Sequence, residues 1–218
     1  MREFFLVLLI LILAGAITLI IRKIYIQVSV NSLLNGDRKS PRLLYNIMKI
    51  RFGSKYLFPD ISLLGSRPEE NARHYVHCEL LFINSAGIFV MRSVEGNGYV
   101  DCTQGDPWYR LINDRAIPFT NPFEKNEVYI HLLKSLFQYE KIPNVPIYNI
   151  VVFTGKKIRL SQRMNGLVVL AHLIPFMENI GKNHFLKRSE KKRLCLAILK
   201  HAKLPEINRS IKKLSRGR

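Results

Sequence analysis

The hydrophobic pattern of the chain begins with an uncharged apolar run over residues 4–21. Because a helix rises about 1.5 Å per residue, this run nearly crosses a hydrocarbon core of about 30 Å. The pattern therefore predicts one transmembrane helix, in a membrane anchor over residues 1–23 that ends at Arg22 and Lys23. A cleaved signal peptide is the alternative, because residues 14–16 are small, but the apolar run continues beyond them.

After the anchor, the pattern consists of shorter apolar segments with the period of either a strand or a helix. Segments rich in alternating or continuous apolar residues predict strands over residues 74–84, 88–94, 99–102, 108–112, 147–154 and 167–170. Apolar positions three and four residues apart predict helices over residues 32–50, 121–142, 173–180 and 188–202. The first helix is expected to be interrupted near Pro41, and the second to begin with Asn121 as its N-cap.

The order of these elements predicts the fold class. Turns at residues 85–87 and 96–98 would join the first strands into an antiparallel meander, which is followed by helix, buried strand and further helices. This order is typical of an α/β (α+β) fold in which helices pack on a mixed sheet. Roughly 195 residues follow the anchor without a Gly/Ser-rich or Pro-rich linker, so one domain is expected.

The charge of the chain limits the partners that it can bind. The formal net charge is +18 and the isoelectric point is near 10.1, which favours polyanions such as nucleic acid or anionic lipid headgroups. The bases are concentrated near the C-terminus, where a solvated helix face is the alternative interpretation. The candidate nucleic-acid-binding residues there are Lys187, Arg188, Lys191, Lys192, Arg193, Lys200, Lys203, Arg209, Lys212 and Lys213.

The distribution of bases around the anchor predicts its orientation. Arg2 precedes the apolar run, whereas five bases follow it: Arg22, Lys23, Arg38, Lys39 and Arg42. The excess on the second side predicts a single-pass membrane protein with a cytoplasmic domain, which in a bacterium would face inward from the inner membrane. Three cysteines without a CxxC pair agree with a reducing compartment.

Several segments resemble the nuclease-related domain family, called NERD, in their order and spacing. The resemblance is carried by residues 78–91, Gly98, Trp108, Asn121–Pro122 with Asn126, residues 145–147 and residues 151–153. It implies a restriction-endonuclease-like fold, in which a mixed central sheet is flanked by helices. The expected organisation is an anchor over residues 1–23, a juxtamembrane helical segment over 24–54, a NERD-like domain over 55–180 and a basic helical tail over 181–218.

The resemblance also implies where a catalytic site would lie. An aspartate of the family pattern falls on Glu79, which keeps a carboxylate, whereas the glutamate and lysine of the Glu-x-Lys motif fall on Arg92 and Val94. In the family pattern, carboxylates hold a divalent cation such as Mg²⁺ or Mn²⁺, and the lysine positions water or neutralises charge. Here Glu79 would be the remaining catalytic and metal position, and it is expected to form an ion pair with Arg92. No resident cofactor is therefore expected unless the chain is an active enzyme.

Three functions remain open from the sequence. The first is a degenerate nuclease-related domain, tethered to a membrane, that binds nucleic acid through its basic surface. The second is an active Mg²⁺- or Mn²⁺-dependent nuclease whose site has migrated to Glu79 with Glu95 or Asp101. The third is a membrane-surface scaffold that lies on anionic lipid and recruits a protein partner.

Overall fold

The computed structural model describes residues 10–21, 24, 40–65, 74–103, 105–180 and 186–204. The described strands form two mixed sheets, so the chain has a mixed α/β fold. The larger sheet has the strand order β10-β1-β2-β3-β7-β9, and the smaller has the order β6-β5-β4-β8. The strands are β1 (Leu57–Gly65), β2 (His74–Ile83), β3 (Ile88–Val94), β4 (Gly98–Asp101), β5 (Trp108–Ile112), β6 (Arg115–Phe119), β7 (Ile147–Phe153), β8 (Ile158–Leu160), β9 (Leu167–Val169) and β10 (Ala202–Lys203).

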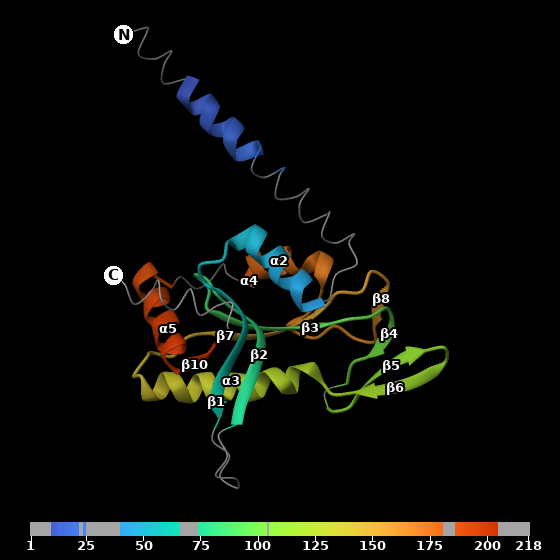
Figure 1. Cartoon of the computed structure of the whole chain (residues 1–218). Helices are drawn as coiled ribbons and strands as arrows, with labels where there is room; N and C mark the ends of the chain where they lie inside the picture. The colour runs from blue at the N-terminus through green and yellow to red at the C-terminus, as the bar shows by residue number, and fades with distance from the viewer. Residues whose placement is uncertain are drawn as a thin grey trace, which may run out of the picture.

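Helices cover both faces of the larger sheet (Figure 1). The core on one face joins the sheet to α3 (Pro122–Tyr139) and α5 (Arg188–His201), and the core on the other joins it to α2 (Ser40–Phe52) and α4 (Leu173–Ile180). A short 3-10 helix, Leu170–His172, precedes α4. Because β3 and β7 lie between the two layers, Val90 and Met91 are both fully buried, on opposite faces.

The predicted β2–β3 hairpin is confirmed. The two strands pair antiparallel from Ile83 and Ile88 to Leu80 and Met91. The buried strand β7 then pairs parallel with β3, and β9 pairs parallel with β7. This arrangement places β2, β3 and β7 side by side at the centre of the larger sheet.

The prediction of one continuous meander is wrong, because β4 does not pair with β3. Instead, β4 pairs antiparallel with β5 and parallel with β8 in the smaller sheet. Gly98 N–H donates to the carbonyl of Lys157 at 2.8 Å, and a Cβ on Gly155 would lie 1.9 Å from the carbonyl oxygen of Gly96. The segment after β3 is therefore held against the segment after β7, which directs β4 into a different sheet.

Four of the described strands were not predicted: β1, β6, β8 and β10. Strands β8 and β10 have only three and two residues, too few for a periodic pattern, whereas β1 and β6 are irregular. Strand β1 contains Pro59 and has a positive φ of 56° at Asp60, and β6 is exposed along almost its whole length. Proline and exposed polar positions both weaken the sequence signal for a strand. Both strands are nevertheless paired, β1 with β2 and β6 with β5.

The predicted details of helices α2 and α3 are only partly confirmed. Asn121 caps α3 as predicted, because its side-chain oxygen accepts a hydrogen bond from Phe123 N–H at 3.0 Å. Helix α2 begins at Ser40, so Pro41 lies in its first turn, a position that tolerates proline; residues 32–39 of the predicted helix lie outside the described residues. Val128, which was expected in the apolar stripe of α3, is 53% exposed.

The two ends of the chain are only partly described. Residues 10–21 are helical with exposed side chains, and among the described residues no helix is long and apolar enough to cross a membrane. The rest of the predicted anchor, residues 1–9 and 22–23, lies outside the described residues. In the predicted C-terminal tail, α5 packs into the core through Leu194 and Ile198, and residues 181–185 and 205–218 lie outside the described part.

Candidate functional site

The family positions Glu79 and Arg92 lie where β2 and β3 part. The backbone ladder between these strands ends at Leu80 and Met91, one residue before the two positions. Beyond that point β2 continues along β1 as far as His74. The site is therefore a place where two neighbouring strands diverge.

The alternation of β2 also breaks at Glu79. Strict alternation would place Cys78 and Leu81 on opposite faces, yet both pack in the core beneath α3. In β1, the residue across from Glu79 is Asp60, whose φ of 56° lies in the left-handed region. The irregularity is thus shared by both strands, and it removes Glu79 from the regular pattern of the sheet.

The side chains of Glu79 and Arg92 bridge the gap between the diverging strands. Glu79 Oε1 accepts a hydrogen bond from Ser93 N–H at 2.9 Å and another from Ser93 Oγ–H. Arg92 Nη2 donates to the backbone carbonyl of His77 at 3.4 Å. Each side chain therefore bonds the backbone of the other strand where the regular ladder has ended.

The expected ion pair between Glu79 and Arg92 does not form. The Glu79 carboxylate is engaged by Ser93, whereas the guanidinium of Arg92 turns toward α3, where its Nε donates to Asn126 Oδ1 at 3.2 Å. The reason is the strand divergence, which offers the carboxylate a backbone donor close by. The positive charge of Arg92 still acts on Glu79 through space.

Asn126 is the centre of a buried polar network that joins β3, α3 and β7. Its side chain is fully buried, and its Nδ2 donates to Asn149 Oδ1 at 2.8 Å and to the carbonyls of Val90 and Ile150 at 3.3 Å. Asn149 Nδ2 in turn donates to Glu127 Oε1 at 2.8 Å. Arg92 is therefore held in place by Asn126, whose own side chain is fixed by its hydrogen bonds to β3 and β7.

The electrostatics at Glu79 do not favour a cation site. Burial raises the pKa of Glu79, and this effect exceeds the opposing effects of the Ser93 hydrogen bonds and the Arg92 charge. A hard cation needs several ionised oxygen ligands, but one carboxylate oxygen here already accepts two hydrogen bonds. Val94, at the lysine position, packs beside the core of the smaller sheet and offers no ligand atom.

The carboxylates proposed for a migrated site do not form a cluster with Glu79. Glu95 is exposed just after β3, and Asp101 lies in β4 of the smaller sheet. In the part of the chain that the structure describes, no group of three or more His, Cys, Asp or Glu side chains could hold a metal ion. The residues present therefore do not fit the Mg²⁺ or Mn²⁺ that the family pattern implies, and no metal-dependent step can be assigned to them.

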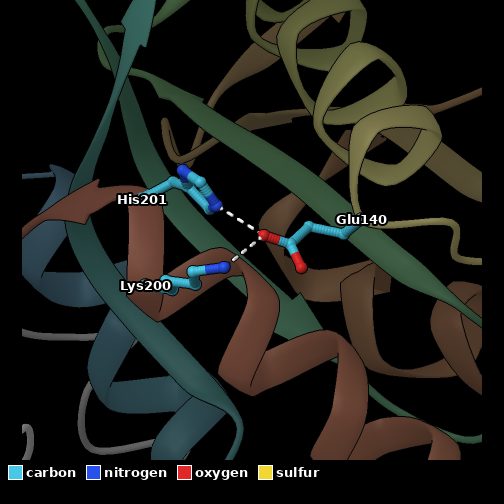
Figure 2. Close-up of polar contacts among 3 residues, drawn as sticks. All are labelled: Glu140, Lys200 and His201. Atoms are coloured by element: carbon cyan, nitrogen blue, oxygen red, sulfur yellow. Dashed lines mark hydrogen bonds and ion pairs between the residues drawn. The ribbon is translucent and has the colours of Figure 1, made fainter.

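The predicted basic residues divide into those with a partner in the fold and those without. Lys200 donates to Glu140 at 2.9 Å, beside His201 at 2.7 Å from the same carboxylate (Figure 2). Arg193 donates to the carbonyl of Lys141 at 3.0 Å, and Lys191 and Lys203 lie over tyrosine rings.

Three predicted bases are exposed and carry a side-chain charge without a partner among the described residues: Lys187, Arg188 and Lys192. They lie on or beside the first turns of α5, whose opposite side is buried. Arg209, Lys212 and Lys213 lie outside the described residues. The structure therefore brings three of the ten predicted bases together as a free basic face.

The sequence interpretation missed the part played by Asn149 and Glu127. They line an open cavity of about 360 Å³ together with Phe123, Tyr148 and Asn165. The signal for Asn149 was present, because it is the polar exception in the otherwise apolar strand β7. A polar residue in a strand buried on both faces requires a hydrogen-bond partner, which Asn126 provides.

Comparison with known proteins yields one family match, and the matched residues include the central strands β2, β3 and β7. No curated protein and no solved structure matches the chain. The nuclease-related domain, NERD, matches residues 43–154, which is just over half of the 218 residues and runs from α2 to the end of β7. The chain therefore belongs to the nuclease-related domain (NERD) family.

Proposed function

We propose that this NERD protein is a membrane-tethered, restriction-endonuclease-like domain that binds nucleic acid through a basic surface and does not cut it. The observation that carries the proposal is the use of Glu79 and Arg92 to bridge β2 and β3. Family membership makes the chain nuclease-related. The bonds of Glu79 to Ser93 and of Arg92 to His77 and Asn126 engage the side chains at two positions where a cutting member would hold its metal.

Nucleic-acid binding is supported by charge. A chain with a formal net charge of +18 attracts polyanions in a sequence-tolerant and salt-dependent way. Lys187, Arg188 and Lys192 supply the part of this charge that the described fold leaves unpaired on one helix face. Such a face contacts phosphates without selecting bases.

Tethering is supported by the apolar run over residues 4–21 and by the bases that follow it. A domain that binds without cutting acts by holding its ligand in one place. Attachment to the inner side of a membrane would give that place, with the domain in the cytoplasm. Anionic headgroups at the same surface would compete with nucleic acid for the basic face.

The binding proposal is tested on the full-length protein in detergent, with a fluorescent DNA duplex and anisotropy measured over a salt series. The triple variant Lys187→Gln/Arg188→Gln/Lys192→Gln should bind more weakly and reduce the slope of log K against log salt by about 2 to 3. A matched control neutralises three exposed bases elsewhere, Arg42, Lys125 and Lys134. If the parent protein does not bind at low salt, or if both triple variants lose affinity equally, the proposed basic face is refuted.

The absence of cutting is tested with supercoiled plasmid in the presence of Mg²⁺ or Mn²⁺. The parent protein and Glu79→Gln should both leave the plasmid intact. Metal-dependent nicking by the parent that disappears in Glu79→Gln would overturn the proposal in favour of an active nuclease with a migrated site. Nicking that is equal in both proteins would instead indicate a contaminating nuclease.

A further inference from the structure

The smaller sheet has one face that the rest of the described fold leaves uncovered. On the other face, Val100, Trp108 and Phe153 form a buried core with Ile158 and Leu160 packed against it. That face is open only toward the β5–β6 end, where Ile112 and Ile117 are 43% and 46% exposed. Successive side chains of a strand point to opposite faces, so the residues between these buried positions point outward. The outward residues of β4, β5 and β8 include two tyrosines and an arginine.

The strand register places these residues next to one another. Tyr99 of β4 is paired with Leu111 of β5 on one side and with Arg159 of β8 on the other. Tyr109 of β5 is paired with Asp101, which makes it the diagonal neighbour of Tyr99, at a spacing of about 7 to 8 Å. Tyr99 is 42% exposed and Tyr109 is 37% exposed.

We infer that Tyr99 and Tyr109 form a stacking platform for the bases of single-stranded nucleic acid, with Arg159 beside them to contact the backbone. The inference rests on the proposed nucleic-acid binding and adds a second surface and a substrate class to it. Unpaired bases stack on exposed aromatic rings, whereas a duplex keeps the faces of its bases covered.

The charge around the platform is complementary to a phosphate backbone. Arg115 and Lys157 are exposed near its edges, at the start of β6 and just before β8. Arg159 lies in the same row as Tyr99, so a base on the ring would bring its phosphate toward the guanidinium. Asp101 is the only carboxylate paired directly with a platform ring in the described register, and it can accept hydrogen bonds from the amino groups of bases.

A second copy of the chain is a weaker candidate for this face. The sheet has two edge strands: β6, which contains Pro118 and begins with Arg115, and β8, which has three residues and carries Arg159 at its centre. A proline without an N–H group and a charged residue are both features that oppose pairing with another strand. Leu111 is the large aliphatic residue paired with Tyr99 on this face. The main features of the face are therefore the two tyrosine rings and Arg159.

The platform can be tested separately from the basic face of α5, because the two lie at opposite ends of the fold (Figure 1). The full-length protein in detergent is titrated into fluorescent oligodeoxythymidine and, in parallel, into a fluorescent duplex. Tyr99→Ala/Tyr109→Ala should weaken binding of the single strand by about tenfold for each ring and leave duplex binding within about twofold. Tyr99→Phe/Tyr109→Phe should restore binding of the single strand, because the stacking surface is kept.

The matched control is Tyr75→Ala/Tyr139→Ala, which removes two exposed tyrosines from the larger sheet and from α3. A second measurement needs no variant: oligonucleotides that carry 5-iodouracil should photo-crosslink the parent protein at Tyr99 or Tyr109. Circular dichroism checks that the alanine variant is folded.

The outcomes separate this inference from the proposed function. If the parent binds neither single strand nor duplex, both fail. If the parent binds duplex but not the single strand, or if the alanine variant binds both as the parent does and no crosslink maps to the platform, only the platform is refuted. A parent dimer that becomes monomeric in the alanine variant would also refute it, because the face would then be an interface between copies of the chain.

Discussion

Replacement of Glu79 separates a bridging role from a metal-binding role. Glu79→Gln keeps a side-chain oxygen that can accept hydrogen bonds from Ser93 N–H and Ser93 Oγ–H, whereas Glu79→Ala removes the acceptor of both. A donor left without a partner in a partly buried site costs about 1 to 3 kcal/mol. We therefore expect the free energy of unfolding of Glu79→Ala to be about 2 to 3 kcal/mol lower than that of Glu79→Gln.

The raised pKa of Glu79 also predicts how the stability of the parent protein changes with pH. Burial raises the pKa of Glu79 above its usual value, so the fold favours the protonated side chain more than the unfolded chain does. The stabilisation from protonation is complete below the unfolded pKa and is lost as the pH rises through the folded pKa. Relative to Glu79→Gln, which does not titrate, the parent should therefore gain stability as the pH falls from 7 toward about 4.

The assay is urea unfolding followed by circular dichroism, with the parent and both variants at each pH. A difference of about 2 kcal/mol corresponds to a midpoint shift of about 1 M urea for a slope of about 2 kcal/mol/M. Equal midpoints for Glu79→Ala and Glu79→Gln would refute the bridging role. Stabilisation of the parent, but not of Glu79→Gln, by added Mn²⁺ would refute the conclusion that the site does not fit a metal.

Four further predictions concern other parts of the fold. Asn126→Leu should reduce the free energy of unfolding by about 2 to 4 kcal/mol, measured by urea unfolding, because it leaves several buried groups without a partner. Gly155→Ala should cost about 3 kcal/mol or more by the same measurement, because the new Cβ would overlap the carbonyl of Gly96. The thiol of Cys78 is fully buried with a pKa raised by burial to about 12, so it should react with a thiol reagent at pH 8 only after denaturation. Hydrogen bonds from Lys200 and His201 lower the pKa of Glu140, so the stabilisation that its carboxylate provides is present near neutral pH and is lost as the pH falls through the folded pKa. Glu140→Gln should therefore have a lower melting temperature than the parent at pH 7, and this difference should vanish in acid.

Failures of these four predictions would be specific. An Asn126→Leu variant as stable as the parent would mean that the buried network contributes little to stability. A stable Gly155→Ala variant would mean that the close approach of the two backbone segments can relax. Rapid native reaction of Cys78 would show that the core beneath α3 opens, and a melting difference for Glu140→Gln that persists in acid would mean that its carboxylate is not the titrating partner.

The sequence was sufficient wherever a signal is local. The strand over 88–94 and the helix over 173–180 were predicted with the bounds that the structure has, because hydrophobic period and turn residues act within a few positions. The N-cap at Asn121 is of the same kind, since the capping bond joins residues two apart. The family resemblance was also readable, because it depends on the order of such local segments.

The division into two sheets could not be read in this way. Strand β4 has an ordinary strand pattern, and nothing in it specifies β5 and β8 as neighbours in place of β3. That choice depends on the close contact between Gly96 and Gly155, which are far apart in the sequence. Strand pairing across such separations is set by packing of the whole chain and not by local propensity.

The same distinction applies to the candidate site. The sequence by itself determined that Arg92 and Val94 occupy the positions of a glutamate and a lysine, and that the chain is strongly basic, because residue identity and charge do not depend on folding. Only the tertiary structure decided what Glu79 and Arg92 do, because it is the divergence of β2 from β3 that exposes Ser93 N–H and the His77 carbonyl to their side chains. An expected ion pair thus became two separate bridges, since the free energy of a buried polar group depends on the partner that the surrounding backbone offers.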